Sequence, residues 1–240
     1  MQQYFIDSTP QVEKLVSFDK EQQKHMKQVL RMKEGTLIKV VDPQEQGYLA
    51  SVVYTEQGVQ AKINEATPSN QEQIKVTLIQ GMIKGERWDM CIQKACEFGV
   101  DRIVPLISKR TVVKTNDKLE KKLERYNKIA LEACEQSKRD HLVHVQAPIT
   151  LAQLETYKSE LNLFAYEDAD SHSQNIKDVL LANPNVKSVS IVIGSEGGFD
   201  QEECKEAQKQ GFQTVSLGKR IYRAETAAMA AIHTTMVILD

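Results

Sequence analysis

Ser188-Val189-Ser190-Ile191-Val192-Ile193-Gly194-Ser195-Glu196-Gly197-Gly198-Phe199 is the most informative stretch of this chain of 240 residues. Its first half is β-branched, which favours a strand buried on both faces, and its glycines favour a tight loop at the strand end. Asp200 is a suitable N-cap and Glu203 stands in capping-box position, so a helix should follow and end near Gly211. A strand, a loop and a helix in this order form the repeating unit of a parallel sheet.

A second unit of the same kind follows directly. Residues 212–217 are predicted to form a strand, residues 218–223 a loop, and a helix should begin near Ala224. This helix is apolar nearly all round from Ala227 to Ile232, which predicts burial on every side. One glycine loop after a strand is common in α/β proteins. Two such loops in succession, each followed by the exposed N–H groups of a helix N-terminus, predict a binding site for a polar or anionic ligand.

Strands and helices alternate from Ile74 onward, which is typical of the α/β class with a parallel sheet. Apolar residues spaced i, i+3, i+4 and i+7 from Trp88 to Ala95 predict the first helix. The other expected strands cover residues 74–83, 102–108, 142–146 and 161–166, and the expected helices begin near residues 84, 117, 150 and 173.

The first part of the chain has a different pattern, with short β segments and one helix that should begin after Asp19. Short strands separated by turns should close as a small β-barrel. The polar segment 67–73 contains a proline and has no periodicity, so we place the boundary between two domains, 1–68 and 74–240, in it. The strands expected in the first domain cover residues 36–41, 48–53 and 59–63.

The composition excludes several classes of protein. A net charge of −2 and a pI of about 6.3 argue against a general polyanion binder. No apolar run is long enough to cross a bilayer and no signal-like segment leads the chain, so we expect a cytoplasmic protein without a membrane partner. The four cysteines lack CxxC spacing and the five histidines are scattered, so we expect reduced core thiols and no metal site.

Basic residues gather in two places although the chain as a whole is slightly acidic. Residues 109–139 contain ten basic and five acidic residues, and residues 20–33 contain a second cluster. Each cluster also has an ordinary interpretation as a solvated helix face with paired charges. We expect phosphate contacts at most from either cluster and base stacking from neither, and the second cluster has no interleaved aromatic residue.

Four stretches carry a resemblance to a known family. They are His25-Met26-Lys27-Gln28-Val29-Leu30-Arg31-Met32-Lys33-Glu34-Gly35, Glu132-Ala133-Cys134-Glu135-Gln136-Ser137-Lys138-Arg139, Gly194 to Phe199, and Leu217-Gly218-Lys219-Arg220-Ile221-Tyr222-Arg223-Ala224-Glu225-Thr226-Ala227. Together they resemble the bacterial small-subunit ribosomal RNA uridine-N3 methyltransferases of the trefoil-knot (SPOUT) superfamily. The chain departs from the usual family residue at four positions, and none of them removes a charge from the glycine loops. The departures are Gln3, Ser195, Tyr222 and Ala224, where the family has Arg, Pro, Leu and Thr.

The resemblance implies a fold, a cofactor and partners. It implies an N-terminal PUA-like barrel that binds RNA, a C-terminal trefoil knot that holds S-adenosylmethionine, and a homodimer formed through the last helix. The substrate would be 16S ribosomal RNA or the small ribosomal subunit. The implied cofactor positions are Ala165, Ile193, Gly194, Gly197, Leu217, Gly218, Ile221 and Ala227. The candidate RNA contacts are Lys24, His25, Lys27, Arg31, Arg110 and Arg139.

Methylation at uridine N3 has its own chemical requirements. The lone pair of the neutral nitrogen is delocalised into both carbonyl groups, so a base and a group that stabilises the anion are required. Arg223 is a candidate stabiliser, and Glu225 and Glu196 are candidate bases. Arg223 has a second interpretation as a phosphate contact or structural ion pair, and Glu225 as a complement to the helix dipole.

Three alternatives compete with this prediction. The first is a non-catalytic RNA-binding ribosome assembly factor with the same fold, which binding of the cofactor would distinguish. The second is a nucleotide enzyme with a phosphate cradle at residues 194–198, but the GxxxxGK[ST] lysine is missing. The third is methyl transfer through a cysteine thiolate, but all four cysteines lie on predicted helices away from the loop tips.

Overall fold

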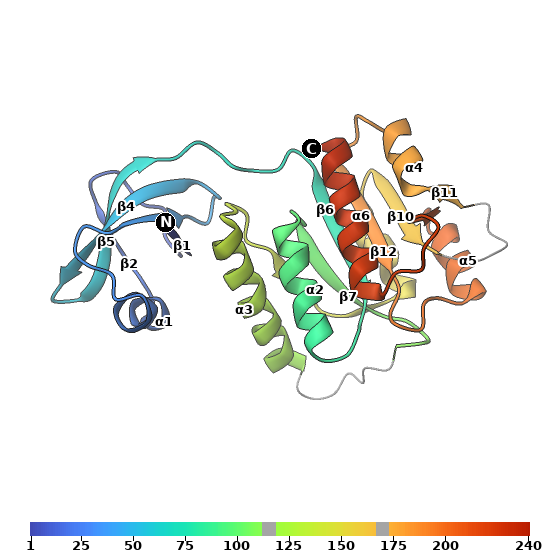
Figure 1. Cartoon of the computed structure of the whole chain (residues 1–240), viewed down its shortest axis with the longest axis horizontal. Helices are drawn as coiled ribbons and strands as arrows, with labels where there is room; N and C mark the ends of the chain where they lie inside the picture. The colour runs from blue at the N-terminus through green and yellow to red at the C-terminus, as the bar shows by residue number, and fades with distance from the viewer. Residues whose placement is uncertain (112–118, 167–172) are drawn as a thin grey trace. The chain divides into compact units, whose positions relative to one another are not determined.

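The computed structural model describes residues 1–111, 119–166 and 173–240. These residues divide into two compact units, Met1–Gln71 with Cys134–Leu142, and Glu72–Ala133 with Val143–Asp240 (Figure 1). The expected helix start at Asp117 lies outside the described residues. The sequence pattern did not indicate that residues 134–142 belong to the first unit.

The first unit contains a five-stranded sheet in the order β1-β3-β4-β5-β2 over its described residues. Its strands are β1 Gln2–Phe5, β2 Leu15–Ser17, β3 Leu37–Val41, β4 Gly47–Thr55 and β5 Gly58–Ala66. The strands expected from the sequence are β3, β4 and β5, which pair antiparallel in the middle of the sheet. Ala50 and Val52 are buried on one face of β4, as the period of two requires. The edge strands β1 and β2 are too short to show this period in the sequence.

The helix of the first unit begins where its sequence predicts. Asp19 caps α1 (Lys20–Lys24) and forms a capping box with Gln22. The chain then continues as a single π-helical segment, His25–Val29, anchored by the fully buried Met26. Such π-helical turns are rare and occur often at functional sites.

The second unit contains a parallel sheet of eight strands over its described residues, which confirms the α/β class. Its order is β11-β13-β10-β12-β6-β7-β8, with β9 beside β7. All its strand pairs are parallel. The strands are β6 Lys75–Gly81, β7 Arg102–Ile107, β8 His144–Val145, β9 Ile149–Thr150, β10 Leu161–Ala165, β11 Gln174–Asn175, β12 Ser188–Ile193 and β13 Gln213–Ser216.

Helices cover this sheet. The helix α6 (Ala224–Leu239) packs against α2 (Glu86–Glu97) and α4 (Ile176–Ala182) and against β6 and β12, and α2 and α6 run side by side in Figure 1. The helix that was expected after Thr150 is a 3₁₀ helix. The helical segments are α2 Glu86–Glu97, α3 Leu119–Ser137, η2 Leu151–Tyr157, α4 Ile176–Ala182, α5 Gln201–Lys209 and α6 Ala224–Leu239.

The prediction that α6 is buried on every side is wrong for the single chain. Ala228, Ala231 and Ile232 are buried, but Val237 is 70% exposed and His233 is also exposed. Apolar and small residues dominate this helix from Ala227 to Ile232, so the sequence pattern did not show which side of the helix is exposed. One face of this helix therefore remains open to solvent.

All four cysteines are buried, as expected, and none of them is in a disulfide bond. No helix among the described residues is both long and apolar enough to cross a bilayer. Within the same ranges, no group of three or more His, Cys, Asp and Glu side chains is placed to hold a metal ion.

Candidate functional site

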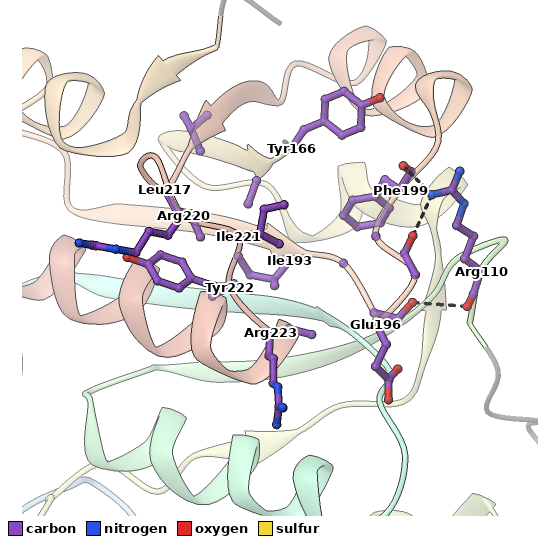
Figure 2. Close-up of a pocket in the computed structure, with 18 of the residues that line it drawn as sticks. Arg110, Tyr166, Ile193, Glu196, Phe199, Leu217, Arg220, Ile221, Tyr222 and Arg223 are labelled. Carbon is purple, nitrogen blue, oxygen red and sulfur yellow. Dashed lines mark hydrogen bonds between the residues drawn. The ribbon is translucent and has the colours of Figure 1, made fainter. Parts of the chain in front are cut away.

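A pocket of about 550 Å³ lies in the second unit where the two glycine loops meet (Figure 2). Seven of the eight expected cofactor positions line it, and Gly218 does not. Glu196 and Arg223, two of the candidate catalytic residues, line it as well. The seven lining positions are Ala165, Ile193, Gly194, Gly197, Leu217, Ile221 and Ala227.

The strand order explains why loops distant in sequence share one pocket. β10 pairs in parallel with β12 on one side and β13 on the other, with Phe164 opposite Val192 and Ala165 opposite Val215. The carboxyl ends of three strands therefore lie at one edge of the sheet, where ligands of α/β proteins bind. Phe199 closes the base of the first loop with its ring centroid 4.4 Å from that of Phe164.

Close packing around the first loop requires glycine both in the loop and on the neighbouring strand β6. A Cβ on Gly81 would lie 2.6 Å from the carbonyl carbon of Gly194, and a Cβ on Gly197 would lie 2.9 Å from the Cβ of Arg110. The buried Gln80 holds the same loop, because its Nε2 donates to the carbonyl oxygens of Gly81 and Gly194 at 3.0 Å.

The segment after β7 braces the first loop from outside. Arg110 was expected to contact RNA, but its Nη1 donates to the carbonyl oxygens of Gly197 at 2.8 Å and Phe199 at 3.4 Å (Figure 2). The backbone N–H of the preceding Lys109 donates to Glu203 at 2.8 Å. Hydrogen bonds from its ammonium group to the carboxylates of Glu202 and Asp200 raise the pKa of Lys109 to about 12. Arg110 thus belongs to the wall of the pocket.

The two candidate bases lie in different surroundings. Oε1 of Glu196 accepts hydrogen bonds from Nη2 of Arg87 at 2.6 Å and from the backbone N–H of Lys84 at 3.3 Å. Glu225 is 4% exposed and is not among the residues that line the pocket. Sequence reasoning missed Arg87, because its place beside the loop depends on β6 pairing with β12.

Burial excludes the cysteine alternative at Cys91. Desolvation by burial, and to a smaller extent the charge of Glu225, raises the pKa of Cys91 to about 12. The thiolate that would attack a pyrimidine ring is therefore scarce near neutral pH.

Arginines dominate the rim of the pocket. Arg220 and Arg223 are exposed, and neither has an ion pair with any residue within the described ranges. Because Glu196 is the one carboxylate among the described lining residues, the rim favours an anionic ligand such as an RNA phosphate. Arg220 was part of the quoted loop, but nothing in the sequence gave it a role. The arginines that line the pocket are Arg87, Arg110, Arg220 and Arg223.

The remaining candidate RNA contacts lie in the first unit. Lys24, Lys27 and Arg31 are exposed, and Nδ1 of His25 lies 3.1 Å from the hydroxyl of Tyr4. Arg139 does not fit the prediction of an RNA contact, because this residue is only 5% exposed. It lies at the end of a long helix, and the helical pattern did not show that residues 134–142 pack into this unit.

Comparison with protein families finds two matches in this chain. Residues 70–236 match the model of the RNA methyltransferase domain, and residues 18–64 match the RNA methyltransferase PUA domain.

Individual relatives agree with these matches. Ribosomal RNA small subunit methyltransferase E of Bacillus subtilis is 33% identical, over 97% of this chain and 94% of its own length. The enzyme of that name from Neisseria gonorrhoeae, solved bound to S-adenosyl methionine, is 28% identical with a TM-score of 0.89 and covers 100% of this chain and 98% of its own. A methyltransferase of Legionella pneumophila in complex with the same cofactor is 30% identical with a TM-score of 0.87, over 98% of this chain and 96% of its own. This chain therefore belongs to the ribosomal RNA small subunit methyltransferase E family.

Proposed function

We propose that the chain transfers a methyl group from S-adenosylmethionine to N3 of a uridine in 16S ribosomal RNA. The observation that carries the proposal is the pocket between the two glycine loops, which is lined by seven of the eight positions that the resemblance assigns to the cofactor. Two similar structures contain that cofactor.

The residues of the pocket fit this cofactor. Ile221 is 86% exposed at the pocket, an apolar side chain that the protein itself leaves in water. An adenine ring against it and Leu217 would remove that surface from solvent. The methionine carboxylate is anionic and suits the arginine rim. When bound, the cofactor supplies an electrophilic methyl group.

The protein would supply the proton transfer and the charge stabilisation. Both hydrogen bonds to Glu196 go to Oε1, so Oε2 has no partner among the described residues and is available to take the N3 proton. We therefore favour Glu196 as the base over Glu225. Arg223, exposed at the pocket, would stabilise the negative charge that develops on the uracil carbonyl oxygens.

Several finer features belong to the same proposal. The predicted domain 1–68 would close as a PUA-like barrel and bind RNA, and domain 74–240 would be threaded as a trefoil knot and carry out the transfer. A second copy of the chain would cover the open face of α6, where Thr226, His233 and Val237 are exposed at helical spacing. The substrate would be 16S RNA or the small ribosomal subunit, which implies a cytoplasmic location.

Nucleoside analysis of ribosomal RNA tests the proposal. Deletion of the gene should remove one N3-methyluridine from 16S RNA, and the intact chain should restore it. An unchanged content of N3-methyluridine would refute the proposal. Calorimetric titration with S-adenosylmethionine distinguishes the methyltransferase from a non-catalytic assembly factor. The enzyme should bind the cofactor, whereas the assembly factor should give no heat at millimolar cofactor.

A further inference from the structure

The fold brings an aromatic residue to a basic segment whose sequence contains none. Tyr54, at the end of β4, is 41% exposed. Nζ of Lys27 lies 5.8 Å from the centroid of its ring. The hydroxyl of Tyr54 donates to the carbonyl oxygen of Met32 at 2.6 Å. The ring thus lies beside residues 27–33, where sequence analysis predicted phosphate contacts alone.

Tyr54 is held both at its ring hydroxyl and at its backbone. In addition to the hydroxyl bond, the backbone N–H of Tyr54 donates to Oε2 of Glu34 at 2.9 Å. A side chain ordered in this way loses little further rotamer entropy when it binds a ligand. The exposed ring is therefore already arranged as a flat apolar surface.

The surrounding charge suits a polyanion. Arg31 and Lys33 are exposed on either side of Met32, and Lys27 is exposed above the ring. The backbone angle φ of Arg31 is +49°, a value that is uncommon for a residue other than glycine. Cations beside an exposed aromatic ring are the combination with which proteins bind single-stranded nucleic acids, because phosphates pair with the cations and bases stack on the ring.

We propose that Tyr54, with Lys27 and Arg31, forms a binding site for an unpaired base of RNA and its flanking phosphates. The inference rests on the proposed function in one respect, that the substrate is RNA. Base-paired RNA hides its ring faces in the helix stack, so the site is specific for a single-stranded segment or a loop. A phosphate would pair with Lys27 while the base stacks on the ring that Lys27 now contacts.

Binding measurements with the full-length chain test this site. The probes are a labelled single-stranded oligoribonucleotide and a duplex of the same length, each titrated at several salt concentrations. Tyr54→Leu should weaken binding to the single strand on the order of tenfold without changing the salt dependence, because stacking releases no counterions. Lys27→Gln should reduce the slope of log K against log salt by about 0.7, the value for one phosphate contact on a single strand.

Two further variants serve as controls. Tyr54→Phe keeps the ring and should bind within about twofold of the parent chain, far less than the loss expected when stacking is removed. Tyr48→Leu makes the same change on the same strand β4, at a tyrosine whose hydroxyl donates to Asp42, and should leave RNA binding unchanged.

The outcomes separate this inference from the proposed function. If the parent chain does not bind RNA, the proposed function fails. If the parent binds RNA and Tyr54→Leu binds it equally well, the stacking site is refuted and the proposed function stands. The same conclusion follows if Tyr54→Leu reduces the slope of log K against log salt as Lys27→Gln does. Tyr54→Trp gives a direct signal, because Trp88, the one native tryptophan, is buried. Its fluorescence should be quenched by the single strand, and no quenching on binding would also refute the site.

Discussion

Nη1 of Arg110 lies 2.8 Å from the carbonyl oxygen of Gly197, and a Cβ on Gly197 would lie 2.9 Å from the Cβ of Arg110. The arginine therefore fits against the loop that forms one wall of the pocket and fixes its carbonyl group. In this arrangement Arg110 holds the first loop in place, and we expect the loop to be ordered in this way before the proposed cofactor binds.

We expect Arg110→Ala to weaken the binding of S-adenosylmethionine by about 1 kcal/mol, or roughly fivefold, because a charge-assisted hydrogen bond at an exposed site is lost. Affinity for RNA should change little. Calorimetric titration gives the cofactor Kd. The matched control is Arg102→Ala, which removes an exposed arginine paired with Asp101 at the start of β7. Equal cofactor affinity in the two variants would show that Arg110 does not brace the loop.

Arg223→Lys should preserve cofactor binding but lower the single-turnover rate on the order of 10²-fold, because lysine keeps the charge and loses the forked geometry. If Arg223 only contacts a phosphate, lysine should serve nearly as well and saturating RNA should rescue the defect. Single-turnover methylation at saturating RNA distinguishes the two roles. A rate within about threefold of the parent, too small for the loss of one such donor, would exclude the catalytic role.

Glu196→Gln and Glu225→Gln form a matched pair, since each replaces a carboxylate by an amide of the same shape. Removal of a general base should lower the rate by about 10² or more, and we expect this for Glu196. Glu225 is buried outside the pocket lining, so its variant should keep the rate within about threefold, well below the contribution of a base. A slow Glu225 variant with normal Glu196 activity would reverse the assignment.

Asp200 makes the stability of the first loop depend on pH. Hydrogen bonds from the backbone N–H of Glu203 and from Lys109 lower the pKa of Asp200 below its ordinary value of 3.8. A lowered pKa stabilises the folded state above the unfolded value, and this stability is lost as the pH falls through the folded value. Asp200→Asn keeps the N-cap and loses the charge. Its Tm should be lower than that of the parent at pH 7, and the difference should begin to shrink near pH 3.8 and vanish below the lowered pKa of the folded state. A constant difference in Tm across this range would contradict the charge effect.

Val237→Glu should convert the proposed dimer to monomers, because it places a charge on the open face of α6. Light scattering should then give 27.2 kDa, against twice this mass for the parent. Leu181→Glu is the control, since Leu181 is an exposed apolar residue of α4, 55% exposed. A parent chain that is monomeric at micromolar concentration would refute the dimer.

Local features of this structure could be predicted from the sequence. The capping boxes at Asp19 and Asp200 depend on residues three positions apart, so their signals are complete within a few residues. The strand β12, which ends in the first glycine loop, was also found, since Val189 to Ile193 form an apolar, β-branched run that is buried throughout apart from the polar but also buried Ser190.

The relations between distant elements could not be predicted. Arg87 reaches Glu196 because β6 pairs with β12, and Tyr54 reaches Lys27 because the end of β4 packs beside the segment after α1. Neither pairing leaves a periodic pattern in the chain. The spacing of residues also does not reveal which loops share a pocket. The expected cofactor positions therefore came from the family resemblance and not from the sequence pattern.

The position of β13 has a consequence for the order of events during synthesis. β10 and β11 each pair with β13, which is made after both of them and after β12. Until residues 213–216 leave the ribosome, the sheet edge that forms the pocket lacks its joining strand. Because chains are made at about 5–20 residues per second, all strands of the first unit are synthesised before the strand that joins the edge of the pocket. The pocket can therefore be completed only near the end of synthesis, once β13 and the start of α6 have been made.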